Sequence, residues 1–241
     1  LGVGVITLYQ AGFKVSEMLN LFSVQLQDAL SPAAANLHAL GDEAGLRDLL
    51  LRTSRLTFNI VVPLYTLCAV YLVPLIQLLT GLDTVEQSII WVGQVLLLAV
   101  FSSQITNSCT KRILMMCGYE RKLLYISLLE SASNLVISIA LAFSIGMLGV
   151  ALGSLIPTVI LGWCLVLPMA LNYTGLSIWK FSAYLLSESL SLIVFFICLT
   201  LVVILLPMPE TGGFFHLALR GGLSLGPCLA VIALRWRKVL Q

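Results

Sequence analysis

The fold of this chain is decided by residues 9–42, YQAGFKVSEMLNLFSVQLQDALSPAAANLHALGD. The stretch is apolar enough to enter a bilayer, yet its middle carries Lys14, Glu17, Gln25 and Asp28. A charge at the centre of a bilayer costs about 2.5–3.5 kcal/mol on insertion scales, so these side chains require water or polar partners. The stretch therefore predicts a membrane helix whose polar side faces the interior of a helical bundle.

Composition extends this prediction to the whole chain. Of its 241 residues, 59% are hydrophobic and only 10% are charged, whereas a soluble domain carries about 25% charged residues. The mean hydropathy is +1.04. These values predict an all-α integral membrane protein with several spans. The net charge of +2 is small and its basic residues are spread over short loops, which excludes a nucleic-acid partner.

Seven apolar helices are predicted. Their approximate ranges are 3–37, 56–80, 88–110, 122–144, 148–171, 184–206 and 214–234. Eleven of the 13 basic residues fall on alternate connections: Arg47, Arg52, Arg55, Lys111, Arg112, Arg121, Lys122, Lys180, Arg235, Arg237 and Lys238. Because cytoplasmic loops carry an excess of Lys and Arg, this pattern predicts a multi-pass membrane protein with a cytoplasmic C-terminus.

Polar residues of the first helix form one stripe. At 100° per residue its members fall within an arc of roughly 80°. They are Gln10, Lys14, Glu17, Gln25 and Asp28. One interpretation is a Lys14–Glu17 salt bridge that only orients the helix, since the two side chains are three residues apart. The other is the wall of an aqueous cavity, which we favour because Gln25 and Asp28 share the same side.

The fourth helix repeats this pattern more weakly. Its polar residues recur every three or four positions, at Ser127, Glu130, Ser131, Asn134 and Ser138. Glu130 has two interpretations. It reaches back to Arg121 or Lys122 at the membrane interface, or it adds an acid to the same cavity.

Three smaller features predict local structure. Asp42 fits a helix N-cap, and the segment that follows it is predicted to be a separate cytoplasmic helix with an apolar side. Gly149 and Gly153 have the spacing that lets two helices approach closely. Arg220 lies about two turns into the last helix and is predicted to extend to the outer interface.

No enzyme motif is present. The chain contains neither G-x-S-x-G, nor HExxH, nor a phosphate-binding loop, and its two histidines are isolated in sequence. The six cysteines form no CxxC pair and have no histidine nearby, so neither a disulfide framework nor a zinc site is indicated. We therefore expect no catalytic residues, no metal site and no cofactor.

Two stretches resemble a known family. They are ALSPAAANLHALGDEAGLRDLLLRTSRL and NSCTKRILMMCGYERKLLYISLLESASNLVISIALAFSIGMLGVALGSLIPTVI. Both are similar to the C-terminal half of polysaccharide flippases of the lipopolysaccharide and O-antigen type. These belong to the multidrug/oligosaccharidyl-lipid/polysaccharide exporter (MATE-like) superfamily. The resemblance covers about residues 5–175.

The resemblance implies a two-lobed transporter with a central cavity. Residues 1–175 would form the C-terminal lobe, residues 176–241 two additional helices, and the N-terminal lobe would be missing from this chain. The implied function is flipping of a lipid-linked oligosaccharide for surface polysaccharide biosynthesis by alternating access, with H⁺ or Na⁺ as a coupling ion and membrane lipids around it. The cavity residues would be Lys14, Glu17, Gln10, Gln25, Asp28, Glu130 and Asn134. Lys14 would contact an anionic pyrophosphate or sugar acid.

Other functions remain as alternatives. The same fold would suit a cation-coupled multidrug exporter, in which Glu17, Asp28 or Glu130 would matter more than Lys14, or a flippase of the peptidoglycan lipid precursor. A membrane glycan polymerase or ligase is less well supported. Those enzymes usually carry a large extracytoplasmic loop, whereas the outer connections predicted here are short and lack Lys and Arg.

Overall fold

The computed structural model describes a helical bundle. The described residues are 10, 12–14, 16–17, 19–21, 24, 28, 30–81, 84–205 and 214–240, and they contain no strand. We call the described part of 10–28 the N-terminal segment; it is helical. The helices that follow are α2 (Ser31–Ala39), α3 (Glu43–Val70), α4 (Leu72–Thr80), α5 (Gln87–Met116), α6 (Glu120–Ile145), α7 (Met147–Leu161), η1 (Gly162–Val166), α8 (Leu167–Tyr173), α9 (Ile178–Leu205) and α10 (Phe214–Leu240).

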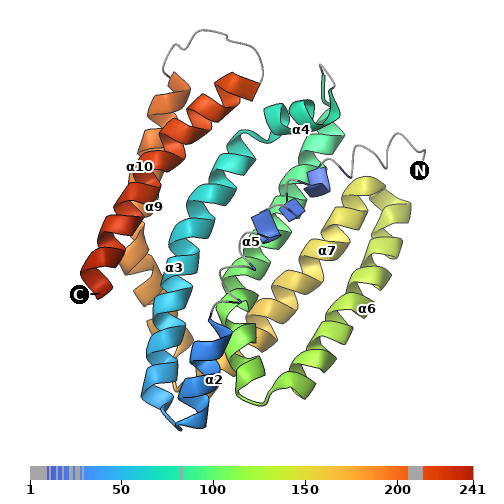
Figure 1. Ribbon diagram of the computed structural model, residues 1–241. Coiled ribbons are helices and arrows are strands. Elements are labelled where there is room, and N and C mark those ends of the chain that lie inside the picture. Colours follow the sequence, from blue (N-terminus) through green and yellow to red (C-terminus); the bar gives the residue numbers. More distant parts are fainter. Residues whose placement is uncertain are drawn as a thin grey trace.

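The long helices run roughly side by side (Figure 1). The α2–α3 and α5–α6 connections lie at one end of the bundle, which we call the basic end because Arg47, Arg121 and Lys122 are next to them. The short helix α4 and the α6–α7 turn lie at the opposite end. The N-terminal segment lies along α5, and a Cβ added to Gly12 would be 3.4 Å from the Cα of Gly93.

The described helices confirm the membrane class of the chain. Four of them are long and apolar enough to cross a bilayer: Glu43–Val70, Gln87–Asn107, Glu120–Ile145 and Met147–Tyr173. A fifth results if Ile178–Ser187 and Ser189–Val203, which meet at a bend of 45°, form one span. The total of seven spans stays a prediction.

The first predicted helix does not continue to residue 37. Leu30 lies in a turn and acts as the N-cap of α2, which starts at Ser31 with Pro32 in its first turn. Proline is favourable there because the first N–H groups of a helix have no intrahelical partner. Ser31-Pro32 therefore opens a new helix.

The segment after Asp42 is also not a separate helix. Asp42 is the predicted N-cap, and its Oδ1 accepts a hydrogen bond from the Gly45 N–H at 2.8 Å. The helix then continues without a break to Val70. Leu46 and Leu50 are buried in the bundle core, so this end of α3 packs against the other helices as part of the bundle. The break comes later, at Tyr71, because Pro74 cannot donate a hydrogen bond to the Val70 carbonyl.

Helices α6 and α7 form a close hairpin. Gly146 makes the turn with a φ of 64°. A Cβ on Gly149 would lie 2.3 Å from the Leu141 carbonyl oxygen, and one on Gly153 would lie 2.5 Å from the Cα of Ser138. The predicted close approach at both glycines is confirmed. The outer side of α6 is apolar and exposed, as at Phe143 (90%), which suits contact with lipid.

The predicted fifth helix, 148–171, contains a π-helical turn between α7 and α8. Gly162 begins that turn where it packs against α5, and a Cβ there would be 2.5 Å from the Thr106 Oγ1. The next residue, Trp163, donates its Nε1–H to the Ser102 Oγ at 3.2 Å. A π-turn widens the helix by one residue and is frequent at functional sites.

Candidate functional site

A small pocket opens between the N-terminal segment, α5 and α7, and we call it the polar pocket after its five polar lining residues, although most of its lining surface is apolar. Its volume is about 180 Å³. Its lining residues are Phe13, Ser16, Asn20, Leu96, Ala99, Val100, Ser103, Ser154 and Thr158. The Gln104 Nε2 donates to the Asn20 Oδ1 at 2.6 Å and so ties α5 to the N-terminal segment beside the pocket. Hydroxyl and amide groups thus line a space between helices whose other surroundings are apolar.

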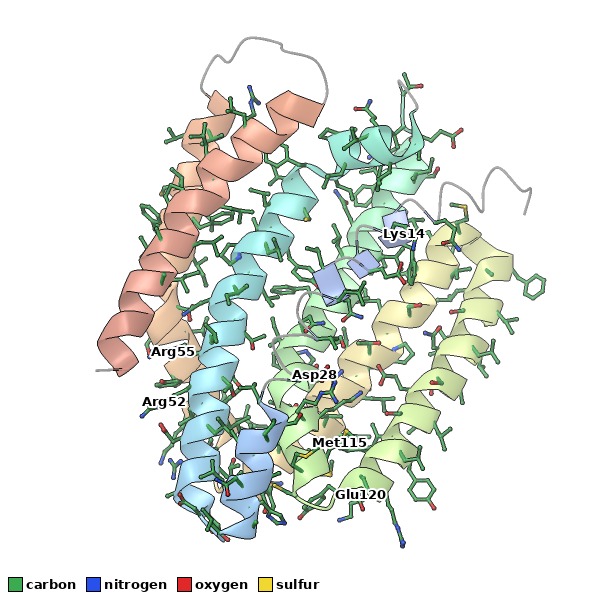
Figure 2. All side chains as sticks on the ribbon, viewed as in Figure 1. Lys14, Asp28, Arg52, Arg55, Met115 and Glu120 are labelled. Carbon is green, nitrogen blue, oxygen red and sulfur yellow. The ribbon has the colours of Figure 1, made fainter. Side chains whose placement is uncertain are left out.

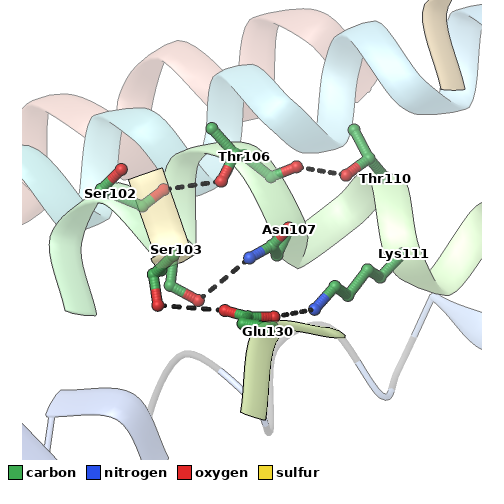
Figure 3. A network of polar contacts seen from close by, with 8 residues as sticks. Ser102, Ser103, Thr106, Asn107, Thr110, Lys111 and Glu130 are labelled. Atoms are coloured by element: carbon green, nitrogen blue, oxygen red, sulfur yellow. Dashed lines mark hydrogen bonds and ion pairs between the residues drawn. The ribbon is translucent and has the colours of Figure 1, made fainter. Parts of the chain in front are cut away.

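Glu130 connects three helices behind this pocket. Its Oε1 accepts a hydrogen bond from the Thr158 Oγ1 at 3.0 Å. Its Oε2 lies 3.4 Å from the Lys111 Nζ (Figure 3). The Lys111 and Glu130 side chains are 27% and 22% exposed. Glu130 therefore pairs with Lys111 of α5 rather than with Arg121 or Lys122. Glu130 lies ten residues into α6, which corresponds to about 15 Å at 1.5 Å per residue.

Asn134 lies one turn further along α6. Its Nδ2 donates to the Ser154 Oγ at 3.4 Å, and its Oδ1 accepts from the Ser138 Oγ at 2.9 Å. Because Ser154 lines the pocket, Asn134 supports the α7 wall from behind. Both predicted residues of the fourth helix therefore lie one hydrogen bond away from a pocket-lining side chain.

The stripe of the N-terminal segment lies beside the pocket lining. Gln10, Lys14 and Asp28 are exposed and Glu17 is half-buried, while Gln25 lies outside the described residues. The Lys14 Nζ is 2.8 Å from the Glu17 Oε2, as the spacing of three residues predicted. At 100° per residue, the lining residues Phe13, Ser16 and Asn20 occupy the adjacent side of the same helix.

Asp28 pairs with Arg112, which lies four residues before the end of α5 (Figure 2). The predicted site residues therefore take part in three ion pairs, Lys14–Glu17, Lys111–Glu130 and Arg112–Asp28. Three positive and three negative charges balance, so these six side chains carry no net charge together. The described residues hold no group of three or more His, Cys, Asp or Glu side chains suited to a metal ion.

Sequence reasoning missed the small polar side chains that line the pocket. The missed residues are Ser16, Asn20, Ser103, Ser154 and Thr158. A signal was available, since Ser16 and Asn20 are four residues apart, as are Ser154 and Thr158. Pairs at that spacing share one side of a helix. The stripe of larger polar and charged residues was the stronger pattern, so the prediction of the cavity wall was based on it and not on these pairs.

Comparison with known proteins gives no relative: neither a protein-family model, nor a curated protein, nor a solved structure matches the chain. A functional proposal therefore rests on the polar pocket, on the three ion pairs and on the sequence resemblance. The hydroxyl oxygens of the pocket lining can accept hydrogen bonds, while the hydroxyl groups of Ser16, Ser154 and Thr158 already donate within the protein. The ion pairs next to it can exchange their partners with a charged ligand.

Proposed function

We propose that this chain is part of a transporter that flips a lipid-linked oligosaccharide across the plasma membrane by alternating access. The observation that carries the proposal is the polar pocket, because it places hydroxyl and amide groups between helices long and apolar enough to span a bilayer. Sugar hydroxyls are donors and acceptors that such side chains satisfy. The lipid tail would stay in the surrounding bilayer.

Lys14 is the proposed contact for an anionic pyrophosphate or sugar acid. Its side chain is 60% exposed and its pair with Glu17 is a solvated one. Exposed ion pairs contribute only about 0–1 kcal/mol, so an incoming phosphate can replace the Glu17 carboxylate at little cost. Glu17 would neutralise Lys14 when no cargo is bound.

The exposed stripe supports a two-lobed arrangement. Gln10, Lys14 and Asp28 are exposed on a helical segment beside membrane-spanning helices. Charged side chains that face the lipid hydrocarbon are costly, so we expect the stripe to face water and a second helical lobe. In this proposal an N-terminal lobe closes the cavity, and a gradient of H⁺ or Na⁺ drives the change of state.

Surface polysaccharide output tests the proposal. The full-length protein carrying Lys14→Ala or the pair Ser154→Ala and Thr158→Val should fail to restore surface polysaccharide in a strain that lacks the gene. Lys180→Ala is the matched control, because Lys180 is exposed and outside the pocket. Membrane levels are measured in parallel by immunoblot. Normal polysaccharide both from Lys14→Ala and from the double variant of Ser154 and Thr158 would refute the proposal.

A cation-coupled drug exporter is the second candidate. The observation that favours it is the Glu130 carboxylate, which lies about 15 Å along a spanning helix and one hydrogen bond from the pocket. Acids in such positions are used as ion sites. Under this alternative, Glu130→Gln makes cells drug-sensitive, while a deletion strain keeps normal surface polysaccharide.

A further inference from the structure

A separate feature lies at the opposite end of the bundle, around Arg220 of α10. The side chain of Arg220 is partly buried, and its Nε is fully buried without a hydrogen-bond partner. Among the described residues no carboxylate lies within ion-pair distance of its guanidinium. An unpaired arginine in a partly buried position is unfavourable, because desolvation of the charge is not compensated.

Tyr71 is the neighbour of this arginine. It occupies the break between α3 and α4, is only 8% exposed, and has a buried hydroxyl without a hydrogen-bond partner. Burial raises the pKa of Tyr71, and the nearby positive charge of Arg220 acts in the opposite direction. Contact between α10 and α3 is close here, since a Cβ on Gly221 would be 3.7 Å from a Leu67 methyl carbon. The contact region between α3 and α10 therefore contains two buried polar groups without hydrogen-bond partners.

The depth of the two residues matches the level of lipid headgroups. Helix α10 has 27 residues, or about 40 Å at 1.5 Å per residue, which exceeds a ~30 Å hydrocarbon layer by about 5 Å at each end. Arg220 is the seventh residue, about 9 Å from the start of the helix. Its side chain is long enough to reach the interface from there. The start of α10 lies at the same end of the bundle as α4 (Figure 1).

We propose that Arg220 and Tyr71 form a binding site for a phosphate group at this end of the bundle. The guanidinium offers a planar fork of donors that matches phosphate oxygens, and the Tyr71 hydroxyl supplies one more donor. The phosphate belongs to an anionic lipid headgroup or is free in solution, since both present the same oxygens. The site is distinct from the polar pocket and does not depend on the proposed function.

The test measures lipid retained by the full-length protein after detergent purification, by native mass spectrometry. Phosphatidylglycerol and phosphatidylcholine are offered in equal amounts. We expect the wild-type protein to retain phosphatidylglycerol in excess. Arg220→Gln should reduce it about tenfold, and Tyr71→Phe about threefold, because the phenylalanine removes only one donor. Arg121→Gln, an exposed arginine at the basic end, is the matched control and should retain the wild-type amount.

Competition with inorganic phosphate distinguishes the two sources. Displacement of phosphatidylglycerol by millimolar phosphate assigns the site to phosphate in general, and resistance to it assigns the site to the lipid headgroup. Arg220→Lys keeps the charge without the planar fork and serves as a second variant if Arg220→Gln fails to fold. Equal lipid binding by wild type and by the Arg220 variants overturns the proposal. A lower melting temperature of Tyr71→Phe with unchanged lipid binding also overturns it, because Arg220 would then act only as an internal partner of Tyr71.

Discussion

Removal of the Lys111–Glu130 ion pair is the perturbation that the structure defines best. At 3.4 Å and an effective dielectric constant of 20, the attraction between the two charges is about 5 kcal/mol before desolvation is subtracted. Both side chains are about three-quarters buried, so desolvation removes most of this attraction. We expect a net coupling energy of about 1–2 kcal/mol.

The two single variants should differ. Lys111→Met leaves the Glu130 carboxylate with only the Thr158 hydroxyl, in a partly buried position between α6 and α7. Glu130→Gln keeps an oxygen that can accept from Thr158, and Lys111 is five residues from the end of α5, where its ammonium can reach the interface. Lys111→Met should therefore lower the free energy of unfolding by about 2–3 kcal/mol, and Glu130→Gln by about 1–2 kcal/mol.

A double-mutant cycle in mixed detergent micelles measures this coupling. The free energies of unfolding of the wild type, both single variants and the double variant give the interaction energy directly. Arg121→Met is the control, because Arg121 is exposed at the basic end of the same hairpin. The reasoning is refuted by a coupling energy below about 0.3 kcal/mol, or by a cost of Glu130→Gln greater than that of Lys111→Met.

Three further outcomes follow from local geometry. Gly153→Leu should lower the free energy of unfolding by about 3 kcal/mol, because the new side chain meets the backbone of Ser138. Gly222→Ala is the control and should be neutral in the same unfolding assay, because no heavy atom lies within 4 Å of a Cβ at that position. Asp42→Ala should lower the free energy of unfolding by about 1 kcal/mol, because the N-cap hydrogen bond from the Gly45 N–H is lost. Asp42→Asn should keep most of that stability, and equal losses in the two variants would contradict a capping role. Lys14→Ala should change the melting temperature by less than about 2 °C, because an exposed pair contributes little, and a large drop would mean that Lys14 is structural.

Features that depend on neighbouring residues in sequence were predictable. The Asp42 cap joins residues three apart, and so does the Lys14–Glu17 pair. The membrane class follows from composition alone. The approach of α6 to α7 was also predictable, because Gly149 and Gly153 have no other evident use in a helix.

Features that depend on packing were not predictable. Lys111 and Glu130 are 19 residues apart, and Thr158 is another 28 residues beyond Glu130, so only the crossing of α5, α6 and α7 brings them together. The π-turn at Gly162 depends on the contact with Thr106 in a different helix. The polar pocket has the same origin, since each of its walls carries only one or two small polar residues, too few to mark a site in any single segment.

The ion pairs differ in how firmly they hold the walls of the polar pocket. Lys111 and Arg112 are neighbours on α5, yet Lys111 pairs with α6 and Arg112 pairs with Asp28 of the N-terminal segment. Glu130 has a second bond, from Thr158, whereas the Asp28 side chain is 49% exposed and its pair is more solvated. Solvated pairs contribute about 1 kcal/mol or less. Loss of the Arg112–Asp28 pair therefore costs less than loss of the Lys111–Glu130 pair, so α6 is held to α5 by the firmer of the two ion pairs.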